Sequence, residues 1–129
     1  MLTTHTLEEI HPHSSNYAHA VSIPAGARML LSNGHMGTRL DGTTPEDVEA
    51  QTEVIFQRLE AVLKADDMSL TDIARITTFL SEVDYQEGYK LIRDRIMGDH
   101  KPANPILIVK ALVRPLLKVE IEIIAAKVE

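Results

Sequence analysis

The sequence predicts a single α+β domain in which two helices pack on one face of a mixed sheet, in the order β-β-α-β-α-β-β. Two segments, 42–66 and 84–97, carry apolar residues at spacings of three and four, which is typical of amphipathic helices. Short apolar or alternating runs precede, separate and follow these segments, as expected of strands. The 129 residues suffice for one domain, 1–129, with its own core.

The chain begins with a polar stretch, 1–13, which we expect to be a solvated arm. His11 and His13 lie two positions apart, but no second pair with ligand spacing follows, so we expect no metal site. Beyond the arm, Tyr17–Ile23 alternates like a strand. A Pro-Ala-Gly turn signal separates it from a second run, Ala27–Ser32, and the two runs predict a hairpin.

The next segment contains Ser32, Asn33, Gly34 and His35. Glycine and asparagine tolerate positive φ and leave backbone N–H groups accessible. Two interpretations remain open at this point. The segment is either a binding loop with polar contacts to a ligand, or an ordinary turn that needs these residue types for its conformation.

The first predicted helix has a recognisable start. Thr44 is a suitable N-cap, Pro45 suits the first helical position, and Asp47 can bond back to the helix start. One apolar stripe follows at helical spacing, made of Val48, Thr52, Ile55, Leu59 and Val62. The charged residues lie off this stripe, so the helix is expected to lie on a sheet with its other side in solvent.

A β-branched run, Ala74–Leu80, predicts the third strand. Asp84 and Glu87 then open a second helix, which Gly98 ends. Its buried stripe is expected to consist of Tyr85, Tyr89, Ile92 and Ile96. Because Tyr89 lies at core spacing, we interpret it as a core residue.

The last two predicted strands are Pro105–Val113 and Leu117–Ala126, separated by Arg114-Pro115. The first of them is apolar on both faces, and a two-layer domain covers only one face with helices. We therefore expect the other face to meet another subunit. Glu120 and Glu122 would lie at or near that boundary, where a carboxylate is either exposed at a rim or held for a purpose.

Composition excludes several classes of function. The net charge of −6 argues against binding to a phosphate backbone, so no nucleic-acid partner is expected. The chain has no cysteine, which excludes disulfides and thiolate chemistry and fits a reducing compartment. We see neither a signal peptide nor an apolar run long enough to span a membrane, so a cytoplasmic protein without membrane contact is expected.

Several short motifs occur together in the order of one known family. Tyr17-Ala18-His19-Ala20-Val21 corresponds to an early Y-S-Q-A-V strand, and Ala50-Gln51-Thr52 to an A-Q-T helix start. Thr77-Thr78-Phe79-Leu80 corresponds to T-x-F-L, and Val119-Glu120-Ile121-Glu122 to V-E-I-E. With these motifs the chain resembles the RidA/YjgF family of imine and enamine deaminases, whose members also carry older labels as endoribonucleases.

The resemblance implies a chorismate-mutase-like fold and a homotrimer with small-molecule pockets between adjacent subunits. It also implies hydrolysis of imines such as 2-aminoacrylate to a keto acid and ammonia, without cofactor or metal. Within this frame, Glu120 is the candidate catalytic residue and would position or deprotonate a water. Tyr17 and the groups of Ser32, Asn33 and Gly34 would contact the substrate, and either His19 or His35 could act as acid or base.

The chain departs from the family at the P-A-R-[ST] motif, which here is Pro102-Ala103-Asn104-Pro105. Asn104 replaces the arginine that holds the substrate carboxylate by a bidentate fork. Lys90 also lies near a position that is often asparagine in the family. These differences predict a branch that lacks the usual arginine, with Asn104 as a substrate contact and a substrate that is neutral or differently charged.

Three functions remain in order of preference. The first is a trimeric hydrolase of the deaminase type. The second is a trimer that binds a metabolite in the same cleft without catalysis, and the third is a ribonuclease, which the acidic composition disfavours. For Glu120 itself, the alternative to catalysis is a structural ion pair with Lys118 or Arg114. Glu122 is expected to be structural.

Overall fold

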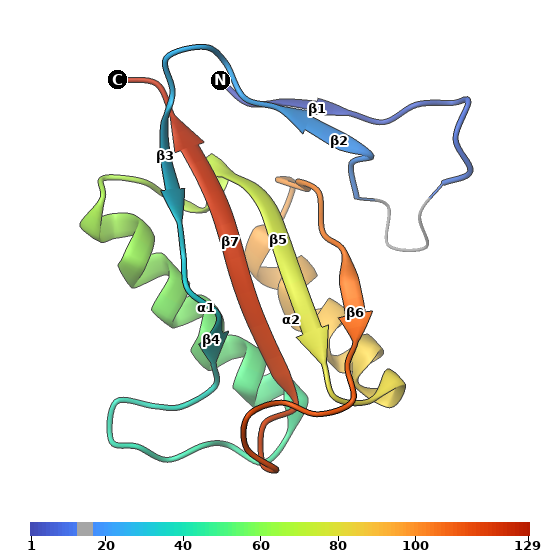
Figure 1. The fold of residues 1–129 in the computed structure, drawn as a ribbon, viewed down its shortest axis with the longest axis vertical. Helices are drawn as coiled ribbons and strands as arrows, with labels where there is room; N and C mark the ends of the chain where they lie inside the picture. The colour runs from blue at the N-terminus through green and yellow to red at the C-terminus, as the bar shows by residue number, and fades with distance from the viewer. Residues whose placement is uncertain (13–16) are drawn as a thin grey trace.

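The computed structural model describes residues 1–12 and 17–129 (Figure 1). Its strands are β1 (Thr3–His5), β2 (Ala20–Ser22), β3 (Arg28–Leu31), β4 (His35–Met36), β5 (Ile73–Leu80), β6 (Ile106–Ile108) and β7 (Val119–Lys127). Its helices are α1 (Val48–Ala65) and α2 (Gln86–Met97), with short 3₁₀ turns η1 (Leu70–Asp72) and η2 (Val83–Tyr85). The predicted α+β class with two helices is confirmed.

The main sheet has the order β3-β7-β5-β6, and β4 pairs with the first residues of β7, at Glu120 and Ile121. Strand β7 runs antiparallel to β3, β4 and β5, whereas β5 and β6 are parallel. The parallel pair is joined through α2, as expected for strands separated by a whole helix. Figure 1 shows both helices behind the same face of this sheet.

Alternation along β7 separates the two faces of the sheet. Val119, Ile121 and Ile123 are buried in the core beneath the helices. Glu120 and Glu122 project to the other side, which we call the open face because no helix covers it. By strand register and alternation, the open face also carries Met29, Leu31, Arg75, Thr77, Phe79, Leu107 and Ile124.

The hairpin predicted from the runs 17–23 and 27–32 is wrong in its pairing. The strand expected over 17–23 is reduced to β2, which pairs with β1 rather than with β3 and so forms a separate small sheet. The predicted solvated arm therefore contains a strand, at the β-branched pair Thr3-Thr4. At the other end of the chain, β6 pairs with β5 alone, because β5 lies between β6 and β7. Such non-local pairings leave no mark in local sequence.

The helix boundaries also differ from those expected. Helix α1 begins after Asp47, whose side chain accepts a hydrogen bond from the Ala50 N–H at 2.6 Å, so Thr44 and Pro45 precede the helix. Leu63 rather than Val62 completes the buried stripe. A 3₁₀ turn precedes α2, and Gly98 ends that helix with a φ of 59°. Among the described residues, no helix is both long and apolar enough to cross a membrane.

Candidate functional site

Glu120 lies on the open face of β7, half-buried, between two other strands. Its register partners are Phe79 on β5 and Met36 on β4. It borders a cavity of about 320 Å³ whose other lining residues are apolar, apart from Glu122. Within the described part of the chain, its carboxylate forms no ion pair and no hydrogen bond.

The contacts of Arg114 and Lys118 do not support the alternative role of Glu120, a structural ion pair with one of them. The Arg114 guanidinium donates a hydrogen bond to Thr38 at 3.1 Å. The Lys118 ammonium lies 5.3 Å from the centroid of the Tyr85 ring. Neither of the proposed partners neutralises the carboxylate, which stays available to a bound molecule.

The segment 32–36 lies along β7 beside Glu120, so the structure brings part of the predicted site together. The Ser32 hydroxyl accepts a hydrogen bond from the Ile123 N–H at 2.9 Å and donates one to the Asn33 carbonyl. Gly34 faces the Glu120 carboxyl group so closely that a Cβ at this position would lie 3.0 Å from Glu120 Cδ. Glycine at this position thus leaves room for the Glu120 carboxyl group, which a larger residue would displace.

His35 does not face this cavity. It pairs with Ile121, and residues opposite each other in an antiparallel ladder project to the same face, which here is the helix-covered one. Its Nδ1 is buried and has no hydrogen-bond partner among the described residues. Burial, with a smaller contribution from the nearby Arg58 guanidinium, lowers the pKa of His35. The ring is therefore neutral near pH 7 and lies behind the strand that carries Glu120.

Tyr17 lies in a second cluster, at the other end of the open face. It is buried, and the Arg93 guanidinium stacks on its ring at 4.0 Å from the centroid. The phenol donates a 3.3 Å hydrogen bond to Asp94. Burial raises the pKa of Tyr17 well above the usual value, so the hydroxyl remains a donor at neutral pH and does not serve as a base.

Asn104 belongs to the same cluster, but its amide is directed into the protein. Its oxygen accepts hydrogen bonds from Tyr89 and Arg93, both at 2.9 Å. Its nitrogen donates to the Ile76 carbonyl at 2.8 Å and lies 3.2 Å from the Thr78 hydroxyl. An amide with every group engaged in this way has no capacity left for a ligand.

Tyr89 and Arg93, on the buried side of α2, form a hydrogen-bonded network with Thr78 and Asn104, which we call the inner network. Tyr89 is fully buried, as predicted, and its hydroxyl accepts a 2.6 Å hydrogen bond from Thr78. Burial raises its pKa to about 12. Arg93 is fully buried between the two tyrosine rings and pairs with Asp94, whose side chain is half-exposed. Sequence reasoning missed Arg93; the only local signal is a charged residue four positions after Tyr89, on the buried side of α2.

The two clusters are far apart within one chain. Arg75, which borders the Tyr17 cluster, is opposite Ile124, whereas Phe79 is opposite Glu120. Four residues of strand separate these pairs, or about 13 Å. A small molecule that touches Glu120 therefore cannot reach Tyr17 of the same chain.

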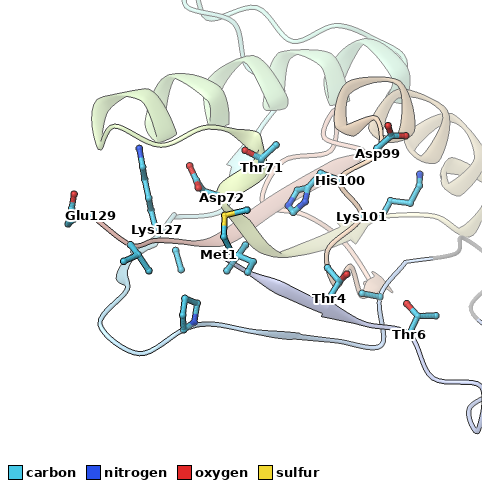
Figure 2. Close-up of a pocket in the computed structure, with 15 residues that line it drawn as sticks. Met1, Thr4, Thr6, Thr71, Asp72, Asp99, His100, Lys101, Lys127 and Glu129 are labelled. Atoms are coloured by element: carbon cyan, nitrogen blue, oxygen red, sulfur yellow. The ribbon is translucent and has the colours of Figure 1, made fainter.

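A larger cavity, of about 800 Å³, lies between β1, the C-terminal residues and the Asp99–Lys101 segment (Figure 2). Several of its charged groups are already engaged: Lys127 donates to the Asp67 carbonyl, and Glu129 pairs with Arg28. None of the predicted site residues lines it. His13 lies outside the described residues, and no group of three potential metal ligands occurs within the described ones.

Comparisons with known proteins agree on one family. The family model described as endoribonuclease L-PSP matches residues 8–127. Protein DfrA of Myxococcus xanthus is 34% identical over 113 residues, covering 84% of this chain and 83% of that protein. Protein HMF1 of Saccharomyces cerevisiae is 26% identical over 116 residues, covering 88% and 86%.

Solved structures show the same fold. The structure of YyfB from Yersinia pestis, a Rid-family protein of unknown function, superposes with a TM-score of 0.85 at 24% identity, covering 98% of both chains. RidA from an Antarctic Psychrobacter gives a TM-score of 0.73 at 21% identity, covering 97% of this chain and 99% of that one.

Proposed function

Because the chain belongs to the endoribonuclease L-PSP family, also known as the Rid or YjgF family, we propose that it is a cofactor-independent hydrolase of the imine and enamine deaminase type. It acts on a small metabolite in a pocket between the subunits of a homotrimer. The observation that carries this proposal is the Glu120 carboxylate, which lies unpaired among the described residues beside an apolar cavity.

Such a carboxylate supports the hydrolysis of a C=N bond. Glu120 accepts a proton from a water as the water oxygen bonds to the imine carbon and the C=N electron pair moves to nitrogen. Return of the proton to nitrogen and collapse of the resulting carbinolamine release ammonia and leave a carbonyl product. Gly34 allows the carboxylate to lie against the 32–36 segment, which limits its orientations.

The open face supports assembly into a homotrimer. Leu31 is 70% exposed and Met29 is 49% exposed on this face, and Leu107 lies 44% exposed at its other edge. A surface of this kind is expected to meet a partner. Contact between copies would also bring the Tyr17 cluster of one subunit toward Glu120 of another, which resolves the separation of about 13 Å within one chain.

The decisive test is Glu120→Gln, with Glu122→Gln as the matched control on the same strand and face. Ammonia and keto-acid release are followed from 2-aminoacrylate generated in situ by a serine dehydratase, and assembly by light scattering after size exclusion. We expect Glu120→Gln to lower turnover at least about tenfold with the assembly intact, while Glu122→Gln retains activity. Undiminished turnover in Glu120→Gln refutes the catalytic assignment.

A second function is favoured by Asn104. Because its amide is engaged inside the protein and no arginine occupies its position, the usual grip on a substrate carboxylate is absent there. A trimer that binds a metabolite without catalysis accommodates this loss. Wild-type protein that is inert toward 2-aminoacrylate, and that is thermally stabilised by a metabolite recovered unchanged after long incubation, would favour this second function.

A further inference from the structure

The cavity beside Tyr17 and Asn104 differs in charge from the rest of the molecule. It has a volume of about 500 Å³ and lies between β2 and the open-face ends of β3, β5 and β7. The chain carries a net charge of −6, yet none of the described residues lining this cavity is acidic. Among the described residues in the lining, only the Arg75 side chain carries a permanent charge. The cavity therefore has the electrostatic character of an anion site.

Arg75 stands apart from the other arginines of the chain. Each of the others donates a hydrogen bond or forms an ion pair within the described residues. The Arg75 side chain, exposed on the open face of β5, has no such partner in the described part of the chain. A parallel bridge to Ala103 places it beside the segment that carries Asn104 and Pro105. A guanidinium with unused donors thus lies in the wall of this cavity.

The inner network lies behind the same wall, and there the Arg93 guanidinium is paired with Asp94. The Arg93 guanidinium stacks on Tyr17 and donates to Asn104, and both of these residues line the cavity. Arg93 itself is fully buried and does not reach the cavity. It acts as a positioning residue that fixes the Tyr17 ring and the Asn104 amide, while Arg75 alone presents free guanidinium donors.

We propose that Arg75 is the residue that binds the acid group of this protein's ligand, so that the ligand is a small carboxylate even though position 104 is asparagine. A guanidinium holds a carboxylate by two parallel N–H···O bonds. The remaining wall, which includes Val21, Ile23, Met29 and Ile124, is apolar and suits a short aliphatic group. The ligand class is thus an aliphatic carboxylate.

This inference deepens the proposed function and rests on it for the reaction itself. If the acid group binds at Arg75, the reacting carbon of a small substrate lies nearer to Arg75 than to Glu120 of the same chain, because about 13 Å of strand separates the position of Arg75 from that of Phe79, the partner of Glu120. It must therefore face Glu120 of a neighbouring copy. The substrate would then be an imine or enamine of an aliphatic acid, the acid group held by one subunit and the C=N bond presented to another.

The test uses isovalerate and its amide, isovaleramide, which differ only in the charge of the acid group and contain no C=N bond. Binding to the full-length protein is measured by NMR titration, which follows the Arg75 side-chain N–H signals. Wild type is expected to bind the acid at least about tenfold more tightly than the amide. Equal affinity for the two compounds, or no binding of the acid, overturns the proposal.

Variants then assign the charge to one residue. Arg75→Gln is expected to lower isovalerate affinity about ten- to hundredfold, and Arg75→Lys, which keeps the charge but loses the fork, to lie between it and wild type. Arg95→Gln is the control, because it removes the same charge from an exposed position on α2. Equal losses in Arg75→Gln and Arg95→Gln overturn the proposal.

Failure of the proposed function gives a different result. Glu120→Gln is expected to lower turnover, while its preference for isovalerate over isovaleramide still depends on the Arg75 guanidinium. If turnover of 2-aminoacrylate proves absent while acid binding depends on Arg75, the anion site stands and the hydrolase does not. If turnover depends on Glu120 but isovalerate binding does not depend on Arg75, the proposed hydrolase function is supported and the proposed anion site at Arg75 is refuted.

Discussion

The polar side chains on the two faces of the sheet differ in whether they have hydrogen-bond partners. Beneath the helices, Arg93, Tyr89 and Asn104 form a network in which each polar side chain has partners, with hydrogen bonds between 2.6 and 3.1 Å. On the open face, Glu120 and Arg75 have no such partner among the described residues. The first arrangement is what burial demands, since an unpaired polar group in a core is costly.

The difference indicates where chemistry is possible. In the inner network every side chain is hydrogen-bonded, and the remaining Arg93 nitrogen, Nη2, forms an ion pair with Asp94. Groups engaged in this way contribute to stability and to one defined packing. Charges on a half-covered face keep their capacity for a ligand, and the apolar residues around them favour a partner surface that would remove water. We therefore assign structure to the inner network and function to the open face, and each assignment predicts a different kind of variant effect.

The largest effect is expected from Arg93→Met, which removes the centre of the inner network. The variant loses the stacking on Tyr17 and Tyr89, the hydrogen bond to Asn104 and the ion pair with Asp94. We expect the free energy of unfolding to fall by about 3 kcal/mol, less than for a pair buried on both sides because Asp94 is half-exposed. Urea denaturation at one protein concentration measures it.

The control for this change is Arg95→Met, two positions along the same helix. Arg95 forms an ion pair with Glu53, and both side chains are well exposed, so its loss is expected to cost less than about 1 kcal/mol. If Arg93→Met and Arg95→Met lower the free energy of unfolding equally, the inner network contributes no more to stability than an exposed ion pair does. The proposed difference between the two faces of the sheet is then wrong.

Sequence reasoning recovered the layers of this protein better than their connections. The alternation along β7 and the stripe of α1 are local patterns, and they correctly predicted the residues that enter the core except at Val62, where Leu63 is buried instead. The pairing of β1 with β2 and of β5 with β6 depends on contacts between distant segments. A strand carries no local mark of which neighbour it will take, so the hairpin predicted over 17–32 was wrong.

The candidate site shows the same division. The proximity of Glu120 and the 32–36 segment followed from a resemblance in motifs and agrees with the close approach at Gly34. The side on which His35 lies depends on register, because a shift by one residue exchanges the faces of a strand. Arg93 could not be assigned from sequence, since a buried arginine is recognisable only with its aromatic and amide partners in place.

Gly34→Ala sharpens the contrast, because it disturbs the open face without touching the inner network. The new methyl group would collide with the Glu120 carboxyl group, which is the end of a flexible side chain and can move away. We expect less than about 1 kcal/mol of destabilisation. Displacement of the proposed catalytic group should nevertheless lower turnover at least about tenfold. Denaturation and ammonia release measure the two effects.

Gly26→Ala provides the opposite pattern. Gly26 has a φ of 80° in the turn between β2 and β3, and a Cβ there would meet no atom within 4 Å. Alanine in this conformation is expected to cost about 1 kcal/mol, with turnover unchanged. A Gly34→Ala protein that keeps full turnover would show that the position of the Glu120 carboxylate is not critical.

The smallest effect concerns His35, which lies behind Glu120 on the helix-covered side. Burial lowers its pKa in the folded protein, so between that value and the usual 6.5 the unfolded chain binds more protons than the folded one. Stability from this group is therefore present above pH 6.5 and is lost as the pH falls through the folded pKa. Urea midpoints at a near-neutral and a mildly acidic pH should differ less in His35→Gln than in wild type. An unchanged difference would show that His35 is solvated like a surface residue, and the inner side of the sheet would then not be uniformly closed to water.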